Sequence, residues 1–190
     1  MRLRPDFFKR TTTTVARELI GKYLVRRIGR RTVAAMITET EAYHGPCDRA
    51  SHASRGKTAR TQIMFGPPGS WYVYFVYGMH HCANVVTGPE GFPAAVLIRA
   101  VDMPSSHGPA RLCKALRIDR QLNGLPSRNA HIWIEDRGVH IPRTHILCGP
   151  RIGVAYAGAW ASKPWRFTLA VQSATLRHIG RSKFRKKRRR

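Results

Sequence analysis

The stretch TETEAYHGPCDRASHASRGKTARTQIMFGPPGSWYVYFVYGMHHCAN, residues 38–84, connects two predicted strands through an unusually long loop. The first strand, residues 32–43, is rich in β-branched residues and follows a turn that begins at Gly29. The second holds five aromatic side chains within seven residues: Trp71, Tyr72, Tyr74, Phe75 and Tyr77. Loops as long as the one between them are usually functional or disordered.

The first strand carries two of the chain's ten acidic residues. In a straight strand, alternation places one set of side chains on a single face: Val33, Ala35, Ile37, Glu39, Glu41 and Tyr43. Carboxylates rarely continue a face that begins with core residues. Two interpretations remain open, because the acids can lie at a solvated strand end or can form part of a functional site.

The loop and the second strand carry basic and aromatic side chains. The basic residues of the loop are Arg49, Arg55, Lys57 and Arg60. Strand aromatics usually fill a core, and we expect Trp71 and Phe75 there. The hydroxyl groups of the three tyrosines favour a cavity or surface instead, where rings in a basic chain can stack on nucleic-acid bases.

The net charge of the 190-residue chain is +24, with a pI of about 11.4. Such an excess favours a polyanionic partner, nucleic acid before an anionic membrane surface. The last ten residues, RSKFRKKRRR, hold eight of the basic side chains, but the rest of the chain is also strongly basic. We therefore expect one domain over residues 1–180, followed by a disordered basic tail over residues 181–190.

The four cysteines are scattered and form no C-x-x-C pair. The opening residues MRLRPDFFKR contain no apolar run of signal-peptide length, and no apolar run approaches membrane-spanning length. We expect the cysteines to be small buried hydrophobes in a reducing compartment. This predicts a cytoplasmic, nucleoid-associated protein if the source is bacterial and a nuclear one if it is eukaryotic.

Other segments predict further elements of an α+β domain with mostly antiparallel strands. Apolar residues at helical spacing from Val15 to Leu24 predict a short helix that contains Gly21. A tight turn near Gly78 predicts a hairpin. The remaining candidates are a helix at residues 108–116 and strands at residues 94–101, 131–135, 139–147 and 166–171.

The sequence lacks the motifs of several common kinds of catalytic site. His44, Asp48 and His52 have helical spacing, but Gly45-Pro46 interrupts them, and we expect no metal site. The sequence contains no H-x-E with a following P-C-x-x-C, no G-x-S-x-G and no glycine-rich phosphate loop. These absences argue against a zinc deaminase, a serine hydrolase and a nucleotide-dependent enzyme.

Long motifs in matching order resemble the alkyladenine (3-methyladenine) DNA glycosylases. They are AREL-IGKYLV from Ala16, ETEAYHGPCDRASHASRGKTARTQIMF, YVYFVYGMHHCANVV, LIRAV, GPARLCKAL and RIGVAYAGAWASKPWRF. The resemblance covers most of the chain but not the basic tail. We expect a single α+β domain with a curved, mostly antiparallel sheet, a protruding β-hairpin and flanking short helices.

The resemblance also implies roles for individual residues. Glu41 corresponds to the base that activates a water, and Arg99 to the residue that positions both. The flipped purine would lie in a pocket made by Tyr43, His52, Tyr74, Asn84 and Ile152, with Asn84 rejecting guanine. The residues entering the duplex would be Tyr77, Met79 and His80.

The expected activity is monofunctional hydrolysis of the N-glycosidic bond of an alkylated or deaminated purine in double-stranded DNA, leaving an abasic site. No cofactor or membrane is expected, and we expect a monomer. A carboxylate suits both proton abstraction and an oxocarbenium-like sugar. We predict that Glu41→Gln abolishes base release and leaves DNA binding intact, whereas Glu39→Gln retains substantial base release. A binding module without catalysis, including an RNA-binding one, is the competing interpretation.

Overall fold

The computed structural model describes residues 1–76 and 78–170. Tyr77, the tail at 181–190 and the preceding residues 171–180 therefore lie outside the described part. The strands are β1 (Tyr23–Ile28), β2 (Arg31–His44), β3 (Trp71–Val76), β4 (His80–Val86), β5 (Ala94–Val101), β6 (Ile132–Glu135), β7 (Ile146–Gly149) and β8 (Arg166–Leu169). The helices are α1 (Pro5–Phe8), α2 (Thr12–Leu19) and α3 (Pro109–Ala115), with short 3₁₀ turns η1 (His52–Arg55), η2 (Gln62–Phe65), η3 (Arg120–Leu122), η4 (Arg143–His145) and η5 (Ala155–Trp160).

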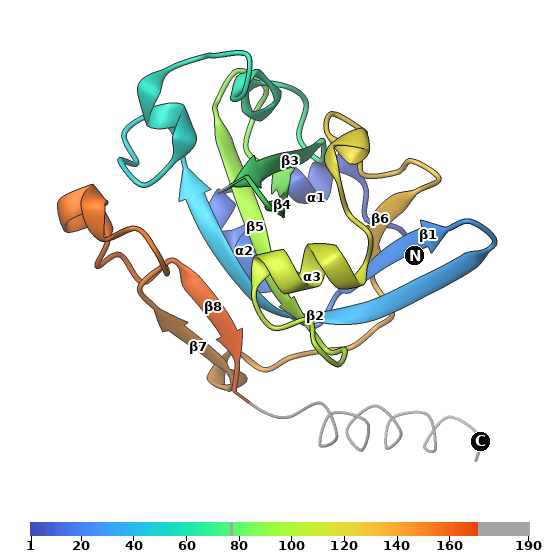
Figure 1. Ribbon diagram of the computed structural model, residues 1–190. Coiled ribbons are helices and arrows are strands. Elements are labelled where there is room, and N and C mark those ends of the chain that lie inside the picture. The colour runs from blue at the N-terminus through green and yellow to red at the C-terminus, as the bar shows by residue number, and fades with distance from the viewer. Residues whose placement is uncertain (77, 171–190) are drawn as a thin grey trace.

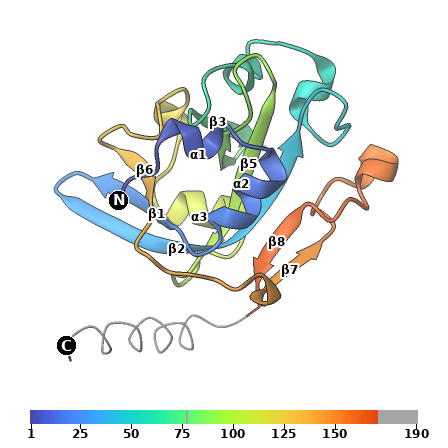
Figure 2. The ribbon, with the colours of Figure 1, turned by 180° about the vertical axis from the view of Figure 1, so that it is seen from behind.

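The strands form one curled antiparallel sheet in the order β3-β4-β5-β2-β1-β6, and β8 joins β2 to β7. Figure 1 shows α3 in front of the sheet, with α1 and α2 behind it, and Figure 2 shows the reverse side. The predicted single α+β domain with a curved antiparallel sheet is confirmed. The long strand β2 is its centre, because it pairs with β1 at one end and with β5 and β8 at the other.

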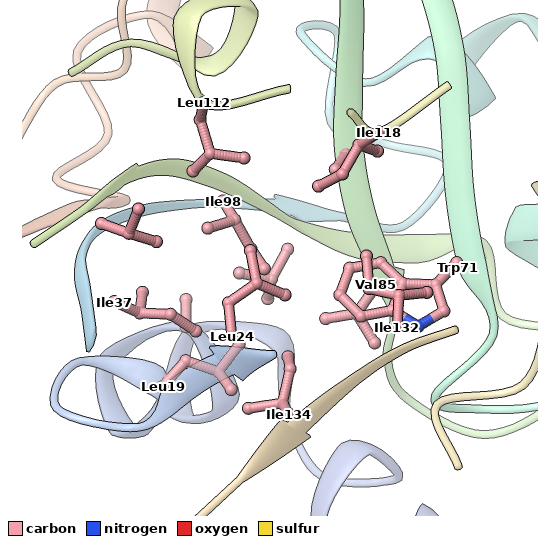
Figure 3. Packing of buried hydrophobic residues seen from close by; sticks show 14 of the residues in the cluster. Leu19, Leu24, Ile37, Trp71, Val85, Ile98, Leu112, Ile118, Ile132 and Ile134 are labelled. Carbon is pink, nitrogen blue, oxygen red and sulfur yellow. The ribbon is translucent and has the colours of Figure 1, made fainter. Parts of the chain in front are cut away.

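The main hydrophobic core joins the sheet to the helices. Figure 3 shows Leu19 of α2, Leu24 of β1 and Ile98 of β5 among its buried side chains, with Leu112 of α3 nearby. Trp71 is fully buried in this core, as predicted. The apolar area buried here stabilises the fold at about 25 cal/mol per Å².

The first helix predicted from apolar spacing is shorter than expected. Helix α2 ends at Leu19, and Tyr23 and Leu24 belong to β1 instead. Gly21 has a positive φ of 88°, and a Cβ at this position would lie 2.6 Å from a side-chain carbon of Ile141. The glycine therefore allows the chain to turn sharply from the helix into the sheet.

Three other predictions are wrong. Residues 139–147 do not form a strand, because Pro142 lacks the N–H that a central strand needs, and only Ile146–Gly149 pairs, as β7. Phe75 is 42% exposed, since it lies near the hairpin tip and packs on His81. Cys47 and Cys148 are exposed because both lie in peripheral segments, whereas Cys82 and Cys113 are buried.

A register irregularity in β2 separates the core face from the acidic residues. Pairing with β5 shifts between Ile37 and Glu39 and again between Glu39 and Thr40. Ile37 consequently packs in the same core as Ala42, and the hydroxyl of Thr40 donates to the Ala16 carbonyl of α2. The single face predicted from Val33 to Tyr43 is thus wrong, because a β-bulge reverses the alternation.

No helix among residues 1–76 and 78–170 is long and apolar enough to cross a membrane.

Candidate active site

Three groups contact the carboxylate of Glu41. Its Oε1 accepts a 2.8 Å hydrogen bond from the backbone N–H of Ile152 and lies 3.3 Å from Nη1 of Arg99. Its Oε2 accepts a 2.8 Å hydrogen bond from the hydroxyl of Tyr43. An ionised carboxylate has about four acceptor positions, so these donors leave one, on Oε2.

The Glu41 side chain is fully buried. Burial raises its pKa above 4.5, while Arg99 and the hydrogen bonds from Ile152 and Tyr43 act in the opposite direction. Burial also raises the pKa of Tyr43 well above 10. The hydroxyl therefore stays protonated and can donate its hydrogen bond to Glu41. Glu41 is therefore a stronger base than a solvated glutamate, yet donors stabilise its ionised form.

The three residues that contact the Glu41 carboxylate, Tyr43, Arg99 and Ile152, line a pocket of about 260 Å³. Its lining includes every residue that the sequence predicted for the pocket, together with Arg99: Tyr43, His52, Tyr74, Asn84, Arg99 and Ile152. The lining also contains Cys82 and Tyr156, which sequence reasoning missed. Because pockets for drug-sized ligands measure about 300–1,000 Å³, this one suits a smaller planar group.

One wall of the pocket is a cluster of three rings. His52 packs edge-on against Tyr74, with ring centroids 4.6 Å apart, and its Nδ1 lies 3.0 Å from the Tyr72 hydroxyl. Burial, followed by the charges of Arg60 and Arg55, lowers the pKa of His52 to about 4. The imidazole is consequently neutral at physiological pH and offers an uncharged aromatic surface.

Asn84 is held firmly in the floor of the same pocket. It pairs with Tyr72 across the β3–β4 hairpin, and its side-chain amide donates a 3.0 Å hydrogen bond to the Tyr72 carbonyl. Asn84 is 3% exposed. Its carboxamide therefore has a fixed orientation beside whatever enters the pocket.

A buried ion pair anchors the segment that brings Ile152 to Glu41. Arg151 donates to both carboxylate oxygens of Asp48 and also to the carbonyls of Ala42 and Trp160. Both charged side chains are completely buried. Sequence analysis considered Asp48 only as a metal ligand and did not single out Arg151. Its place in the long RIGVAYAGAW motif was the available signal.

A second, larger cavity of about 880 Å³ opens next to the first. Three arginines and several hydroxyl groups line it: Arg49, Arg55, Arg60, Ser51, Ser54, Thr58 and Thr61. The two cavities share Ser51, His52 and Tyr156. This composition suits an anion such as a phosphodiester immediately beside the planar group in the smaller pocket.

Two of the residues predicted to enter the duplex, Met79 and His80, lie where β4 begins and do not line the small pocket, although Val76 at the end of β3 does. Met79 is 67% exposed, and His80 is also exposed. Tyr77 lies outside the described residues. The structure thus brings together the predicted catalytic and pocket residues and leaves the hairpin tip projecting beside them.

Comparison with known proteins places this geometry in a family. Residues 6–173 match the family model described as Methylpurine-DNA glycosylase (MPG). The chain belongs to the methylpurine-DNA glycosylase family. It is an enzyme that hydrolyses N-glycosyl bonds in DNA and thereby acts in DNA repair.

Relatives of this glycosylase occur in bacteria and in an archaeon. A protein of Anaeromyxobacter dehalogenans named "Putative 3-methyladenine DNA glycosylase" is 54% identical over 175 residues, covering 89% of this chain and 84% of the relative. Proteins with the same name in Myxococcus xanthus and Methanocella arvoryzae are 48% and 46% identical, covering 85% of this chain and 86% and 89% of their own lengths.

Proposed function

We propose that this glycosylase binds a damaged purine flipped out of duplex DNA and releases it by hydrolysis with a water that Glu41 activates. The proposed substrates are 3-methyladenine, 7-methylguanine, hypoxanthine and ethenoadenine. The observation that carries the proposal is the Glu41 carboxylate, which is fully buried and contacts three residues that line an aromatic pocket. The donors among the described residues leave one of its acceptor positions open.

The first step is base flipping. Extruding a nucleotide costs a few kcal/mol, and least for a damaged or mispaired base. Tyr43 on one side and the pair His52 and Tyr74 on the other would stack on the extruded purine. The adjacent basic cavity would hold the flanking phosphates, with Arg49, Arg55 and Arg60 as their donors.

The second step is cleavage. A water bound at Oε2 of Glu41 would lose its proton to the carboxylate while it attacks C1′ of the sugar. The departing purine takes the electrons of the glycosidic bond. The negative carboxylate would also stabilise the oxocarbenium character of the sugar, and the positive charge of Arg99 would orient Glu41.

Selectivity would come from the walls of the pocket. An alkylated purine such as 7-methylguanine carries a positive charge, which aromatic faces favour. The fixed amide of Asn84 would disfavour guanine by contact with its 2-amino group. 7-Methylguanine keeps that group, and it would still be released because its cationic base is a good leaving group. Normal adenine would be rejected chiefly because it leaves poorly and is costly to flip.

A substrate panel tests this function. Duplexes with one hypoxanthine, ethenoadenine, 7-methylguanine or 3-methyladenine are incubated with excess enzyme, and the free base and the alkali-labile strand break are measured separately. We expect free damaged base and a strand that stays intact until alkali is added. A strand break without alkali would contradict monofunctional hydrolysis, and binding without base release would favour a catalytically silent module.

A further inference from the structure

We propose that Glu39 is a positioning residue that holds the Arg99 guanidinium between two carboxylates. Because Arg99 then interacts with both Glu39 and Glu41, it orients Glu41 without occupying all of its acceptor positions. This inference rests on the proposed role of Glu41 as the base. It assigns to the second acid of the β2 pair a part in the reaction that does not require contact with the substrate.

The side chains form a row of alternating charge across three strands. Oε1 of Glu39 accepts a 3.1 Å hydrogen bond from Nη1 of Arg166 and lies 3.4 Å from Nε of Arg99. Arg99 then reaches Glu41 through Nη1 at 3.3 Å. The row therefore runs from Arg166 on β8 to Glu39 on β2, to Arg99 on β5 and back to Glu41 on β2.

The backbone fixes this row in place. The register of β2 against β5 shifts on both sides of Glu39, and the shifts leave Arg99 between the partners of Glu39 and Thr40. Arg166 is the cross-strand partner of Glu41 on the other edge of β2. Because a β-bulge re-aims side chains, Glu39 and Glu41 meet the same guanidinium.

The row is largely buried, and low exposure to water strengthens the electrostatic interactions between its charges. The exposed fractions of the Glu39, Arg99 and Glu41 side chains are 16%, 11% and 0%. Nε of Arg99 is buried and has no hydrogen-bond partner among residues 1–76 and 78–170, although Glu39 lies just beyond bonding geometry. A guanidinium in this position follows whichever carboxylate attracts it more strongly.

Glu39 thus opposes the effect of Arg99 on the base. Arg99 lowers the pKa of Glu41, and the negative charge of Glu39 raises it. The other groups that face Glu41 are the Tyr43 hydroxyl and the Ile152 amide, with the Cys82 thiol near it on β4. Without Glu39, Arg99 would turn fully to Glu41, lower its pKa further and compete for the lone pairs that the water needs.

The test compares Glu39→Gln with Glu18→Gln, which neutralises an acid in an exposed ion pair with Arg10. Single-turnover release of hypoxanthine from duplex DNA is measured between about pH 4.5 and 8. For Glu39→Gln we expect a plateau rate about tenfold lower, the size expected when one ion-pair contact that positions Arg99 is lost. The acidic limb of the profile should move to lower pH, and DNA affinity should be unchanged.

Glu39→Asp keeps the charge and should restore the position of the acidic limb, whereas Glu18→Gln should match the unmodified enzyme. An unchanged plateau in Glu39→Gln overturns the proposal. A lower plateau with an unmoved acidic limb also overturns it, because a merely structural role would have that effect. If the base is not Glu41, Glu41→Gln keeps its activity, and that outcome is separate from either result for Glu39.

Discussion

The backbone N–H of Ile152 donates a 2.8 Å hydrogen bond to Glu41, a residue 111 positions earlier in the chain. Ile152 lies in the loop after β7, so this donor to the carboxylate comes from outside the paired strands β2 and β5. Arg151 immediately precedes Ile152, so the buried ion pair with Asp48 anchors the chain one residue before this amide.

Arg151→Gln should therefore destabilise the fold and impair the site together. Removing one partner of a buried ion pair costs about 3–5 kcal/mol, because Asp48 keeps an uncompensated charge. Urea unfolding measures the loss. The control is Arg137→Gln, which breaks a largely exposed pair with Glu135 and should cost about 1 kcal/mol or less. Equal losses for the two variants would contradict the structural role of Arg151.

Tyr43→Phe should shift the pH profile in the direction opposite to Glu39→Gln. In the unmodified enzyme, the hydrogen bond from the Tyr43 hydroxyl lowers the pKa of Glu41. Removing the hydroxyl should raise that pKa and move the acidic limb of base release to higher pH. The aromatic ring, and with it stacking, remains. Tyr72→Phe is the control, since that hydroxyl contacts His52 and not Glu41. A shift of the same size in both variants would count against the Tyr43–Glu41 contact.

Glu41→Gln should gain stability relative to the unmodified enzyme as pH rises. The pKa of Glu41 is higher in the folded chain than in the unfolded one, so ionisation weakens folding from about pH 4.5 upward. Glutamine carries no such penalty. Chemical unfolding at pH 4 to 8, with about one unit between points, measures the difference. A difference that shrinks with rising pH would show that donors, and not burial, dominate at Glu41.

Asn84→Ala should weaken discrimination against guanine. The variant loses the fixed amide in the pocket and one buried hydrogen bond, worth about 1 kcal/mol. Asn123→Ala is a matched control, because Asn123 also anchors β3, by accepting from the Val73 N–H, but does not line the 260 Å³ pocket. The measurement is the rate of guanine release relative to hypoxanthine. An equal change in both variants would indicate a general effect of the hairpin.

The features that could be predicted from the sequence are those set by residues close together in the chain. The β1–β2 turn, the buried β5 and the α3 start at Pro109 each follow from residues close together in the chain. The long motifs located the pocket residues, although they lie on β2, β3, β4, β5 and two loops. The pocket-lining residues Tyr43, His52 and Tyr74 could be named from these motifs, but their geometry required the fold.

The features that escaped prediction depend on distant contacts. The β-bulge around Glu39 is an irregularity of the pairing with β5, and alternation within β2 contains no sign of it. The partner of Asp48 is Arg151, more than a hundred residues away, so local spacing suggested a metal ligand instead. Exposure of Phe75 depends on where the hairpin leaves the sheet.

The most direct test of the central claim compares the unmodified enzyme with Glu41→Gln on a duplex with a single hypoxanthine, under single-turnover conditions. DNA affinity is measured on the same duplex. We predict equal binding and a base-release rate lower by at least about 10²-fold in the variant, because a general base contributes that much or more. Base release within a few-fold of the unmodified enzyme would contradict the assignment of Glu41 as the base.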